Sequence, residues 1–280
     1  MELIYGRPVA DTILEDVKEM IARSGVRPGL AVLLVGDDPA SHLYVSMKEK
    51  AALSVGIHFV KEVLLDTVSE ADLISCIEAW NEDENIHGIL VQVPLPMGFD
   101  TDKIIAAIDP KKDVDGFHPE TVARFLAGED DACPVFPRAL MELFHSTKVN
   151  AHGLNGVALV NSEYFGRVMM QAMENEGIVP RIVLADDFQK GGVDISDADI
   201  VFSACGIPSF VRGHQVKDGV VIIDGGIAKQ DGKIVGDVDA ESVTLKVSSL
   251  SPVPGGVGPV TIACLLRRTA QLMEKYKNRG

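Results

Sequence analysis

The chain has 280 residues, of which 46% are hydrophobic and 24% charged. This composition is that of a globular protein with one or two domains, and it excludes a disordered or fibrous chain. The formal net charge of −15 and an aromatic content of only 5% argue against nonspecific binding to nucleic acid or to an anionic membrane.

The four cysteines are far apart and form no C-x-x-C pair, so the sequence predicts neither a disulfide framework nor a metal site. The first residues lack the basic start and the apolar run of a signal peptide. No apolar stretch is long enough to span a bilayer. We therefore expect a cytoplasmic protein that acts on small molecules.

In the first half of the chain, strand-length apolar runs alternate with amphipathic segments. The runs predict buried parallel strands, and the segments between them predict helices. Ser69 and Asp72 have the spacing of a helix capping box, with Asp72 as a shorter substitute for glutamate. The predicted order is strand 30–35, helix 41–55, helix 69–80 and strand 89–93.

The second half repeats this alternation and predicts a doubly wound, Rossmann-like arrangement. A domain boundary near residue 140 is expected, because the strands of both halves would otherwise form one unusually wide sheet. A last helix, over 261–276, follows a segment rich in proline and glycine. The predicted strands are 157–160, 182–185, 200–204 and 220–223, with a helix over 164–175.

Tyr44 and Lys48 are the first candidates for chemistry. Pro39 and Ser41 indicate a helix start, so Tyr44 and Lys48 lie one turn apart on one face. A hydroxyl beside an ammonium supplies a donor, an acceptor and a proton carrier whose pKa falls on desolvation. The alternative is a solvated helix face, since Glu49 and Lys50 follow at once.

Gln92 interrupts an apolar strand just before two prolines. A buried amide must be hydrogen-bonded, and open α/β sheets bind ligands at the carboxyl ends of their strands. Gln92 is therefore either a ligand-binding residue or an amide satisfied by a neighbouring loop. Asp113 and Asp115, beside Gly116, indicate a tight loop in which either carboxylate could cap the turn. His118 is expected on the surface or in packing.

The segment 251–261 contains three prolines and three glycines. Such a segment either lets a ligand approach the main chain closely or forms a hinge between domains, and both can hold.

Taken together, five segments in this order resemble the bifunctional methylenetetrahydrofolate dehydrogenase/methenyltetrahydrofolate cyclohydrolase family, over nearly the whole chain. They are Tyr44-Val-x-x-Lys48, Gly88-Ile-Leu-Val-Gln-Val-Pro-Leu-Pro96, Lys112-Asp-Val-Asp-Gly-Phe117, Gly232-Lys-Ile-Val-Gly-Asp-Val238 and Pro252-Val-Pro-Gly-Gly-Val-Gly-Pro-Val-Thr261.

The resemblance implies a catalytic folate-binding α/β domain over 1–140, completed by the C-terminal helix 262–280, and a Rossmann-like NAD(P)-binding domain over 141–261. The active cleft would lie between them, and the protein would be a homodimer formed through the nucleotide domain. Lys48 would be catalytic, aided by Tyr44 and Gln92, and Asp115 would hold the pterin ring. The folate pocket would include Tyr44, Lys48, Val91, Gln92, Val93, Asp115, Pro254, Gly255, Gly256, Val257 and Gly258.

The resemblance also implies NADP or NAD as cofactor, held by Asn161, Ser162, Gly166, Arg167 and Ile227. Here the chain departs from the family. Val160 replaces the first glycine of the phosphate loop, and Glu163 stands where pyrophosphate would approach a helix N-terminus. The family's His-Ser-x-Thr is replaced by Asp186-Asp-Phe-Gln189, and acids there suit the free 2′-hydroxyl of NAD and oppose the 2′-phosphate of NADP. The alternative is that the two acids form a solvated strand end.

Three functions are therefore open. The first is oxidation of methylenetetrahydrofolate to methenyltetrahydrofolate and hydrolysis of the latter to 10-formyltetrahydrofolate, either with both activities or with a weak or lost dehydrogenase. The second is a non-catalytic folate-binding or regulatory protein, which would have less reason to keep the set Tyr44, Lys48, Gln92 and Asp115. The third is a dehydrogenase for another substrate, which the altered phosphate loop opposes.

Overall fold

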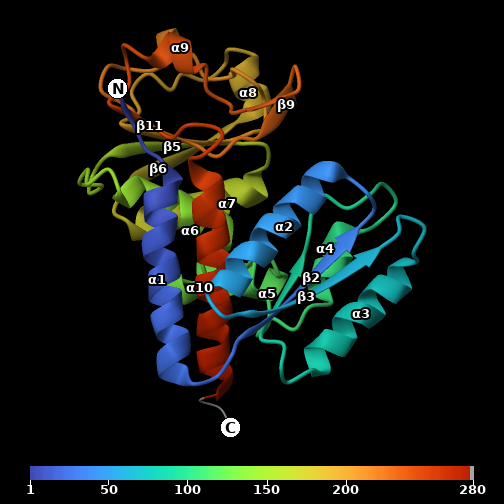
Figure 1. The fold of residues 1–280 in the computed structure, drawn as a ribbon. Helices are drawn as coiled ribbons and strands as arrows, with labels where there is room; N and C mark the ends of the chain where they lie inside the picture. Colours follow the sequence, from blue (N-terminus) through green and yellow to red (C-terminus); the bar gives the residue numbers. More distant parts are fainter. Residues whose placement is uncertain (278–280) are drawn as a thin grey trace. The chain divides into compact units, whose positions relative to one another are not determined.

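The computed structural model describes residues 1–277, and the chain folds into two compact units (Figure 1). The three-stranded unit comprises residues 11–124 and 262–277, and the six-stranded unit comprises residues 1–10 and 125–261. The units therefore separate after Arg124 rather than near residue 140. The first ten residues join the six-stranded unit because β1 (Glu2–Leu3) pairs with β11 (Ser249–Leu250).

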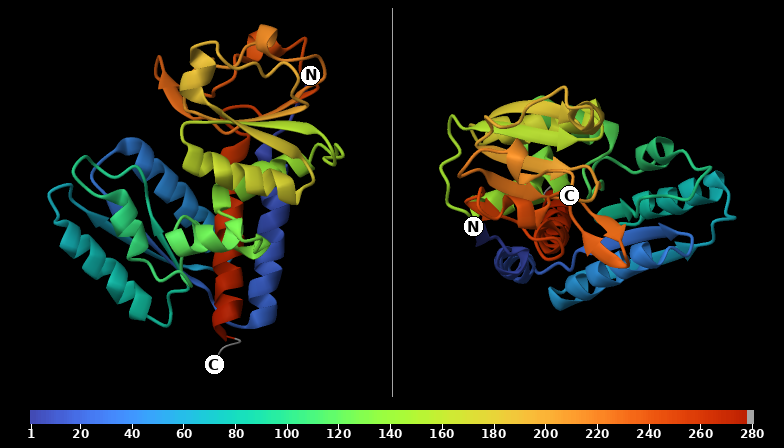
Figure 2. Two further views of the ribbon diagram at one scale, coloured as in Figure 1. Left: turned by 180° about the vertical axis from the view of Figure 1, so that it is seen from behind. Right: turned by 90° about the horizontal axis from the view of Figure 1, so that it is seen from above.

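The three-stranded unit has a parallel sheet with helices on both faces, as Figures 1 and 2 show. All seven residues of its central strand are buried, which is why that strand is a continuous run of small and branched apolar residues. The strand order is β3 (His58–Leu64), β2 (Gly29–Val35) and β4 (Gly88–Val91). Its helices are α2 (Pro39–Ser54), α3 (Glu70–Glu82) and α4 (Thr101–Ala106).

The two faces of β2 pack against different helices. Ala31, Leu33 and Val35 lie in one apolar cluster with Leu73 of α3 and Ile104 of α4. On the other side α2 covers β2 and β3. This sandwich fixes α2 against the strands, so a side chain on the inner face of α2 has a defined position relative to the carboxyl end of β4.

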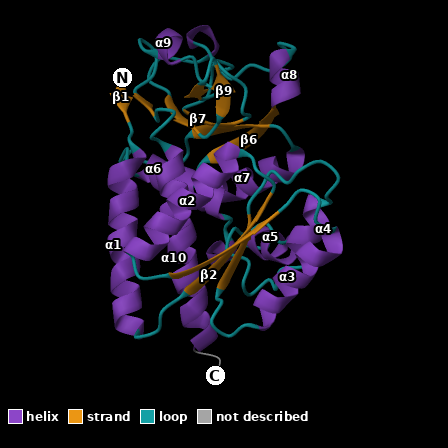
Figure 3. Cartoon of the chain, turned by 45° about the vertical axis from the view of Figure 1, so that its right-hand side comes forward, coloured by secondary structure: helices purple, strands orange, loops and turns teal. Residues whose placement is uncertain are grey.

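The six-stranded unit is a parallel sheet of the doubly wound type, as predicted, and Figure 3 shows the strands of the two units as separate sheets. Strand β6, which follows β5 in the chain, lies on one side of β5, and the next strand, β7, lies on the other side. The topological switch point is therefore between β5 and β7. The order is β1, β11, β8 (Val221–Asp224), β7 (Ile200–Ala204), β5 (Asn155–Val160) and β6 (Val179–Leu184).

Helices and short loops cover both faces of this sheet. On one face lie α6 (Val135–His145) and α7 (Glu163–Asn175), and the other carries an apolar cluster that includes Phe188 of α8 and Val243 of α9. An antiparallel hairpin follows β8. The remaining elements are η1 (Asp130–Ala132), α8 (Ala185–Gln189), η2 (Gly213–Gln215), β9 (Ala228–Gln230), β10 (Lys233–Val235) and α9 (Ala240–Val243). Three helices contribute residues to both units: α1 (Gly6–Ser24), α5 (Pro119–Leu126) and α10 (Val257–Lys277).

The structure confirms most of the predicted elements and corrects their ends. Strand β3 was missed, because its exposed and half-buried side chains at the sheet edge give no apolar run. Strand β4 ends at Val91, and β6 ends at Leu184. Helix α10 begins at Val257, four residues before the predicted 261, because its first turn is hidden within the proline- and glycine-rich segment. Among the described helices, none combines the length and apolar character needed to cross a membrane.

Candidate active site

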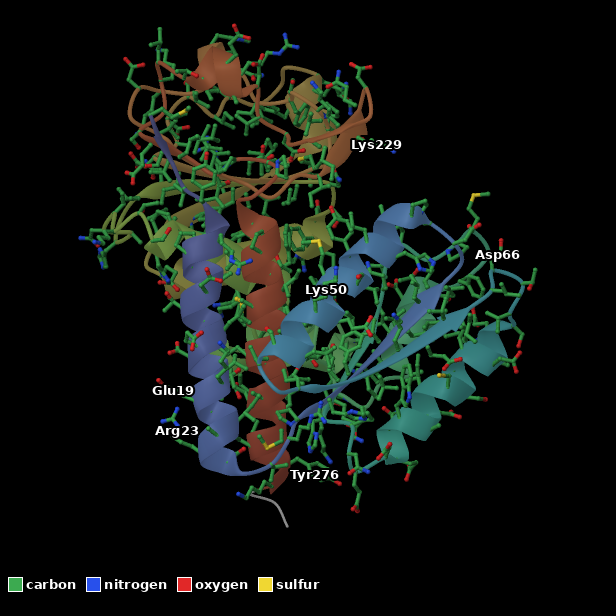
Figure 4. The ribbon with its side chains drawn as sticks, in the orientation of Figure 1. Glu19, Arg23, Lys50, Asp66, Lys229 and Tyr276 are labelled. Atoms are coloured by element: carbon green, nitrogen blue, oxygen red, sulfur yellow. The ribbon has the colours of Figure 1, made fainter. Side chains whose placement is uncertain are left out.

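Helix α2 presents Tyr44 and Lys48 on one face. The helix begins as the sequence predicts, with Pro39 at its first position, and Asp38 caps it by accepting a hydrogen bond of 2.8 Å from the amide of Ser41. Tyr44 and Lys48 follow at a spacing of four residues and are both half-buried. The inner position of Lys48 contrasts with Lys50, which is exposed on the same helix (Figure 4).

Lys48 reaches the end of β4. Its Nζ donates a hydrogen bond of 2.7 Å to Oε1 of Gln92. Gln92 lies directly after the strand, rather than within it, but its backbone amide still donates to the Leu33 carbonyl at 2.8 Å. Its Nε2 donates to the Val93 carbonyl at 2.7 Å, which orients the amide so that Oε1 accepts from the lysine. The loop therefore satisfies one end of the amide, as one interpretation expected, and the other end accepts from Lys48. A ligand-binding role of Gln92 stays a prediction.

The loop after α4 brings Asp115 near the lysine. Asp113 is buried and caps this loop, with its carboxylate accepting from the amides of Gly116 and His118, both at 2.9 Å. Gly116 has a φ of 88°, a conformation that suits glycine. The loop is also tied to β4, because the Ile89 amide donates to the Lys112 carbonyl at 2.8 Å. Asp113 is therefore the structural carboxylate, and Asp115 is the one that interacts with Lys48.

Burial and mutual attraction set the protonation of this pair in opposite directions. Burial lowers the pKa of Lys48, and the negative charge of Asp115 opposes that change. Burial raises the pKa of Asp115 to about 6, with Asp113 adding to the rise while Lys48 and Arg268 oppose it. The site thus contains a lysine that gives up its proton more readily than a free lysine and an acid that ionises less readily than a free aspartate.

Arg268 is a member of this charge group that the sequence analysis did not single out. It lies in α10 and is buried, within a helix segment that is otherwise mostly apolar. A charged residue inside an apolar helical stretch is the signal that could have identified it, because arginine is rarely buried without a partner.

The predicted folate residues 254–258 belong to the six-stranded unit. The loop is fixed by backbone hydrogen bonds from Gly6 to the Gly255 carbonyl at 2.8 Å and from Gly256 to the Pro252 carbonyl at 2.7 Å. Gly255 has a φ of 104°, which side chains rarely adopt. Val257 and Gly258 were expected in the loop, but they form the first turn of α10.

The predicted cofactor residues lie around the carboxyl end of β5 and in the loop after β8. Val160 is the last residue of β5 and is buried, so its side chain packs in the core and the turn starts at Asn161. Ser162 caps α7 by accepting from the Phe165 amide at 3.3 Å, and Arg167 is exposed one turn later. Ile227, in the loop after β8, is 49% exposed.

Gly166 meets a requirement of a dinucleotide-binding turn. A Cβ at this position would lie 2.8 Å from the side chain of Ile182 on β6, so only glycine allows α7 to pack this closely on the sheet. Close helix–strand packing is the role of the last glycine in the dinucleotide-binding fingerprint. The switch point, the capped helix and this glycine together fit a nicotinamide dinucleotide.

Asp186 and Asp187 are not at a free strand end, because β6 passes directly into α8. Both acids lie in the first turn of that helix and are exposed, and Oδ1 of Asp187 lies 3.7 Å from Nζ of Lys190. Acidic side chains in a first turn interact favourably with the helix dipole, which gives them a structural role beside any role toward a ribose. Within residues 1–277, no three His, Cys, Asp or Glu side chains gather in a group that could hold a metal ion.

Known proteins match this chain over its full length. Residues 4–115 match the model of the tetrahydrofolate dehydrogenase/cyclohydrolase catalytic domain, and residues 134–277 match that of its NAD(P)-binding domain. The bifunctional protein FolD of Nautilia profundicola is 40% identical over 280 residues, covering 99% of this chain and 98% of the relative.

Solved structures agree. The bifunctional FolD enzyme of Campylobacter jejuni has a TM-score of 0.92 at 37% identity, with full coverage of both chains. The Trypanosoma brucei FolD structure, complexed with NADP and an inhibitor, has a TM-score of 0.90 at 31% identity, covering 99% of this chain and 98% of that one.

The raised pKa of Asp115 predicts a pH-dependent stability. A folded-state pKa of about 6, well above the ordinary value of an aspartate, means that the folded chain holds this proton more tightly than the unfolded chain. The contribution of Asp115 to the free energy of unfolding is therefore fully present below the pKa that Asp115 has in the unfolded chain. It is lost as the pH rises through the pKa that Asp115 has in the folded chain. Relative to Asp115→Asn, which has no proton to lose, the wild type should lose about 1–3 kcal/mol of unfolding free energy between about pH 4 and pH 7.

Urea unfolding at a series of pH values measures this difference. Asp66→Asn, at an exposed acid labelled in Figure 4, is the control and should give a difference that varies little with pH. A difference for Asp115→Asn that stays constant from pH 4 to pH 7 would contradict the assignment of a half-buried carboxyl group with a raised pKa.

Proposed function

The chain belongs to the tetrahydrofolate dehydrogenase/cyclohydrolase family, and we propose that Lys48 carries the proton transfers of its folate chemistry. The enzyme oxidises methylenetetrahydrofolate to methenyltetrahydrofolate and hydrolyses the latter to 10-formyltetrahydrofolate. The observation that carries the proposal is the 2.7 Å hydrogen bond from Lys48 to Gln92, in a site where burial lowers the pKa of the lysine. A solvated helix face would provide neither feature.

The hydrolysis needs a base, and Lys48 supplies it. The methenyl carbon has iminium character, so water adds to it and loses a proton as the new C–O bond forms. A lysine with a lowered pKa can accept that proton and return it to the ring nitrogen as the C–N bond breaks, while the hydroxyl of the adduct releases its own proton to solvent and becomes the formyl carbonyl. Gln92 holds the amine in place, because its own amide is fixed by Val93. The half-buried Tyr44, one turn from Lys48, completes the polar group.

Asp115 suits the recognition of the pterin ring. A carboxylate can accept two hydrogen bonds from an amino group and the adjacent ring N–H. The loop capped by Asp113 holds Asp115 in place without using its carboxylate as the cap. The proposal also assigns folate contacts to Val91, Val93 and the segment 254–258, in which Gly255 is half-buried and Gly256 is buried.

The dinucleotide, when bound, supplies the hydride acceptor of the oxidation. The residues that would hold it are Asn161, Ser162, Gly166, Arg167 and Ile227. Glu163 lies in the first turn of α7 and opposes a pyrophosphate there, while the exposed Arg167 one turn later offsets its charge. The proposal is therefore that both activities are present and that cofactor binding is the weaker part of the enzyme.

Two further features belong to the proposal. The four cysteines form no disulfide bonds, which is consistent with a reducing cytoplasm. The protein is a homodimer formed through the six-stranded unit, where β6 lies at an edge of the sheet and Val179 on that strand is 57% exposed. An edge strand offers backbone groups that a second chain can pair with.

The first test concerns Lys48. Lys48→Met keeps most of the side-chain length but removes the amine, and it should lower the hydrolysis rate by about 10²- to 10⁴-fold. The measurement is the loss of methenyl absorbance above the buffer rate at neutral pH. The matched control, Lys50→Met, alters an exposed lysine of the same helix and should keep the wild-type rate. Equal rates for wild type and Lys48→Met would refute the proposal.

The second test concerns the choice of cofactor. Wild type should prefer NAD to NADP and be weak with both, because a carboxylate about 4 Å from a 2′-phosphate costs about 4 kcal/mol at an effective dielectric constant of about 20. The double variant Asp186→Ser/Asp187→Arg should shift the preference toward NADP.

Reduction of the two cofactors is followed side by side with methylenetetrahydrofolate. Asp218→Asn, at an exposed acid that pairs with Lys246, is the control and should leave the preference unchanged. A clear preference of the wild type for NADP would mean that Asp186 and Asp187 do not face the ribose.

The third test concerns assembly. Light scattering at micromolar concentration should give twice the chain mass of 30.1 kDa. Val179→Lys, which places a charge on the exposed edge strand, should move the mass toward that of a single chain. The control Lys229→Glu changes a charge on the exposed hairpin strand β9 (Figure 4) and should leave the mass unchanged. A wild-type mass of about 30 kDa would exclude the dimer.

A further inference from the structure

Two buried carboxylates lie in the six-stranded unit, apart from the lysine site. Asp224 ends β8 and is 3% exposed, and Asp237 follows β10 and is fully buried. The β9–β10 hairpin lies between them in the chain. A buried carboxylate is costly unless its oxygens accept several hydrogen bonds, so such a pair calls for an explanation.

Asp237 accepts all its hydrogen bonds from the carboxyl end of β7 and the loop that follows. Its Oδ2 accepts from the Ser203 hydroxyl at 2.6 Å and from the Cys205 amide at 2.7 Å. Its Oδ1 accepts from the Ile207 amide at 2.8 Å. The Asp237 side chain thus accepts from the amides of Cys205 and Ile207. These two amides lie outside any helix or strand.

Asp224 holds Asp237 in turn. Its Oδ1 accepts from the amides of Gly226 and Asp237, at 2.9 and 3.1 Å, and its Oδ2 accepts from the Val238 amide at 3.0 Å. Burial, and then the charge of Asp237, raise the pKa of Asp224 to about 7. The two acids are therefore linked through the backbone at the base of the hairpin.

Two glycines are required by this arrangement. A Cβ at Gly226 would lie 2.1 Å from Oδ1 of Asp237, and a Cβ at Gly236 would lie 2.0 Å from Oδ2 of Asp224. Each carboxylate thus packs directly against the main chain of a glycine. This accounts for Gly226 in the segment Asp224-Gly-Gly-Ile227 and for Gly236 in the segment Gly236-Asp-Val238, which the folate chemistry does not explain.

The loop 205–207 lies at the switch point of the sheet, where a doubly wound fold binds its dinucleotide. Asn161, at the end of β5, donates from Nδ2 to the Cys205 carbonyl at 2.7 Å, which joins the two loops that flank the switch point. On the other side, a Cβ at Gly206 would lie 3.3 Å from the Ile227 carbonyl. The loop that Asp237 holds therefore contacts two of the residues assigned to the cofactor.

We propose that Asp237 is a positioning residue for the dehydrogenase reaction, whose carboxylate holds the loop 205–207 in the conformation that the dinucleotide binds. The inference rests on the proposed dehydrogenase function. Asp237 acts through Cys205 and Ile207, and through them on Asn161 and Ile227. Asp237 has no part in the hydrolysis, because that reaction needs no dinucleotide and its assigned base, Lys48, lies in the other unit.

The test is Asp237→Asn, which keeps the shape of the side chain but replaces one acceptor oxygen with an NH₂ group. The carboxylate accepts from three donors through two oxygens. The asparagine side chain has only one acceptor oxygen, so it cannot accept from all three. We expect the KM for NAD and NADP to rise by about tenfold to a hundredfold, while the hydrolysis rate stays within about twofold of wild type. Retained hydrolysis would show that the variant is folded.

Asp239→Asn is the matched control. It makes the same change two residues away, at the N-cap of α9, where the carboxylate accepts from the Ser242 amide. It should leave both KM values unchanged. Ser203→Ala removes one donor to Asp237 without a charge change and should raise the KM by a smaller factor, so it serves if Asp237→Asn does not fold.

Hydrogen exchange gives a readout that does not depend on activity. In wild type the Cys205 and Ile207 amides should be protected, and in Ser203→Ala and Asp237→Asn they should exchange faster while the β7 and β8 amides stay protected. Dinucleotide KM values that match wild type in both variants, or unprotected amides in wild type, would overturn the inference alone. A wild type that reduces neither cofactor would overturn the dehydrogenase proposal and this inference with it.

Discussion

The hydrogen bond between Lys48 and Gln92 depends on two separate parts of one unit, helix α2 and the end of strand β4. Helix α2 must begin at Pro39 and lie on the sheet for Lys48 to point inward, and β4 must end at Val91 for Gln92 to leave the strand. Partial burial of an ammonium is unfavourable in itself. The amide oxygen of Gln92 accepts a hydrogen bond from the lysine and the charge of Asp115 favours its protonated form, while burial still lowers the pKa of Lys48.

Much of this could be predicted from the sequence, because the relevant signals are local. Central strands such as β2 and β7 are continuous apolar runs, and the spacing of Tyr44 and Lys48 follows directly from helical geometry. Strand β3 could not be predicted in this way, because an edge strand with exposed side chains has no apolar run. The first turn of α10 was hidden by glycine and proline, residues that usually indicate a loop.

The interactions that the sequence could not supply are those between residues far apart in the chain. Asp113 and Asp115 are equivalent in the sequence, and only the fold shows that Asp113 caps the loop while Asp115 meets Lys48 and Arg268. Asp224 and Asp237 are likewise ordinary acids beside glycines until the hairpin brings them together. In both cases a buried carboxylate accepts hydrogen bonds from loop amides and so fixes the backbone of that loop.

The division into two units also bears on how the altered phosphate loop is to be understood. The changes at Val160 and Glu163 lie entirely in the six-stranded unit, whereas Lys48, Gln92 and Asp115 all lie in the other. Val160 is absorbed into the core as the end of β5, and Asn161 ties the turn to the loop after β7. The turn is thus held by contacts of its own residues. A protein that had merely lost its cofactor would have no need of an amide bridge at the switch point or of a buried carboxylate holding the facing loop. The structure of this unit therefore favours an enzyme that still binds a dinucleotide at the turn that follows β5.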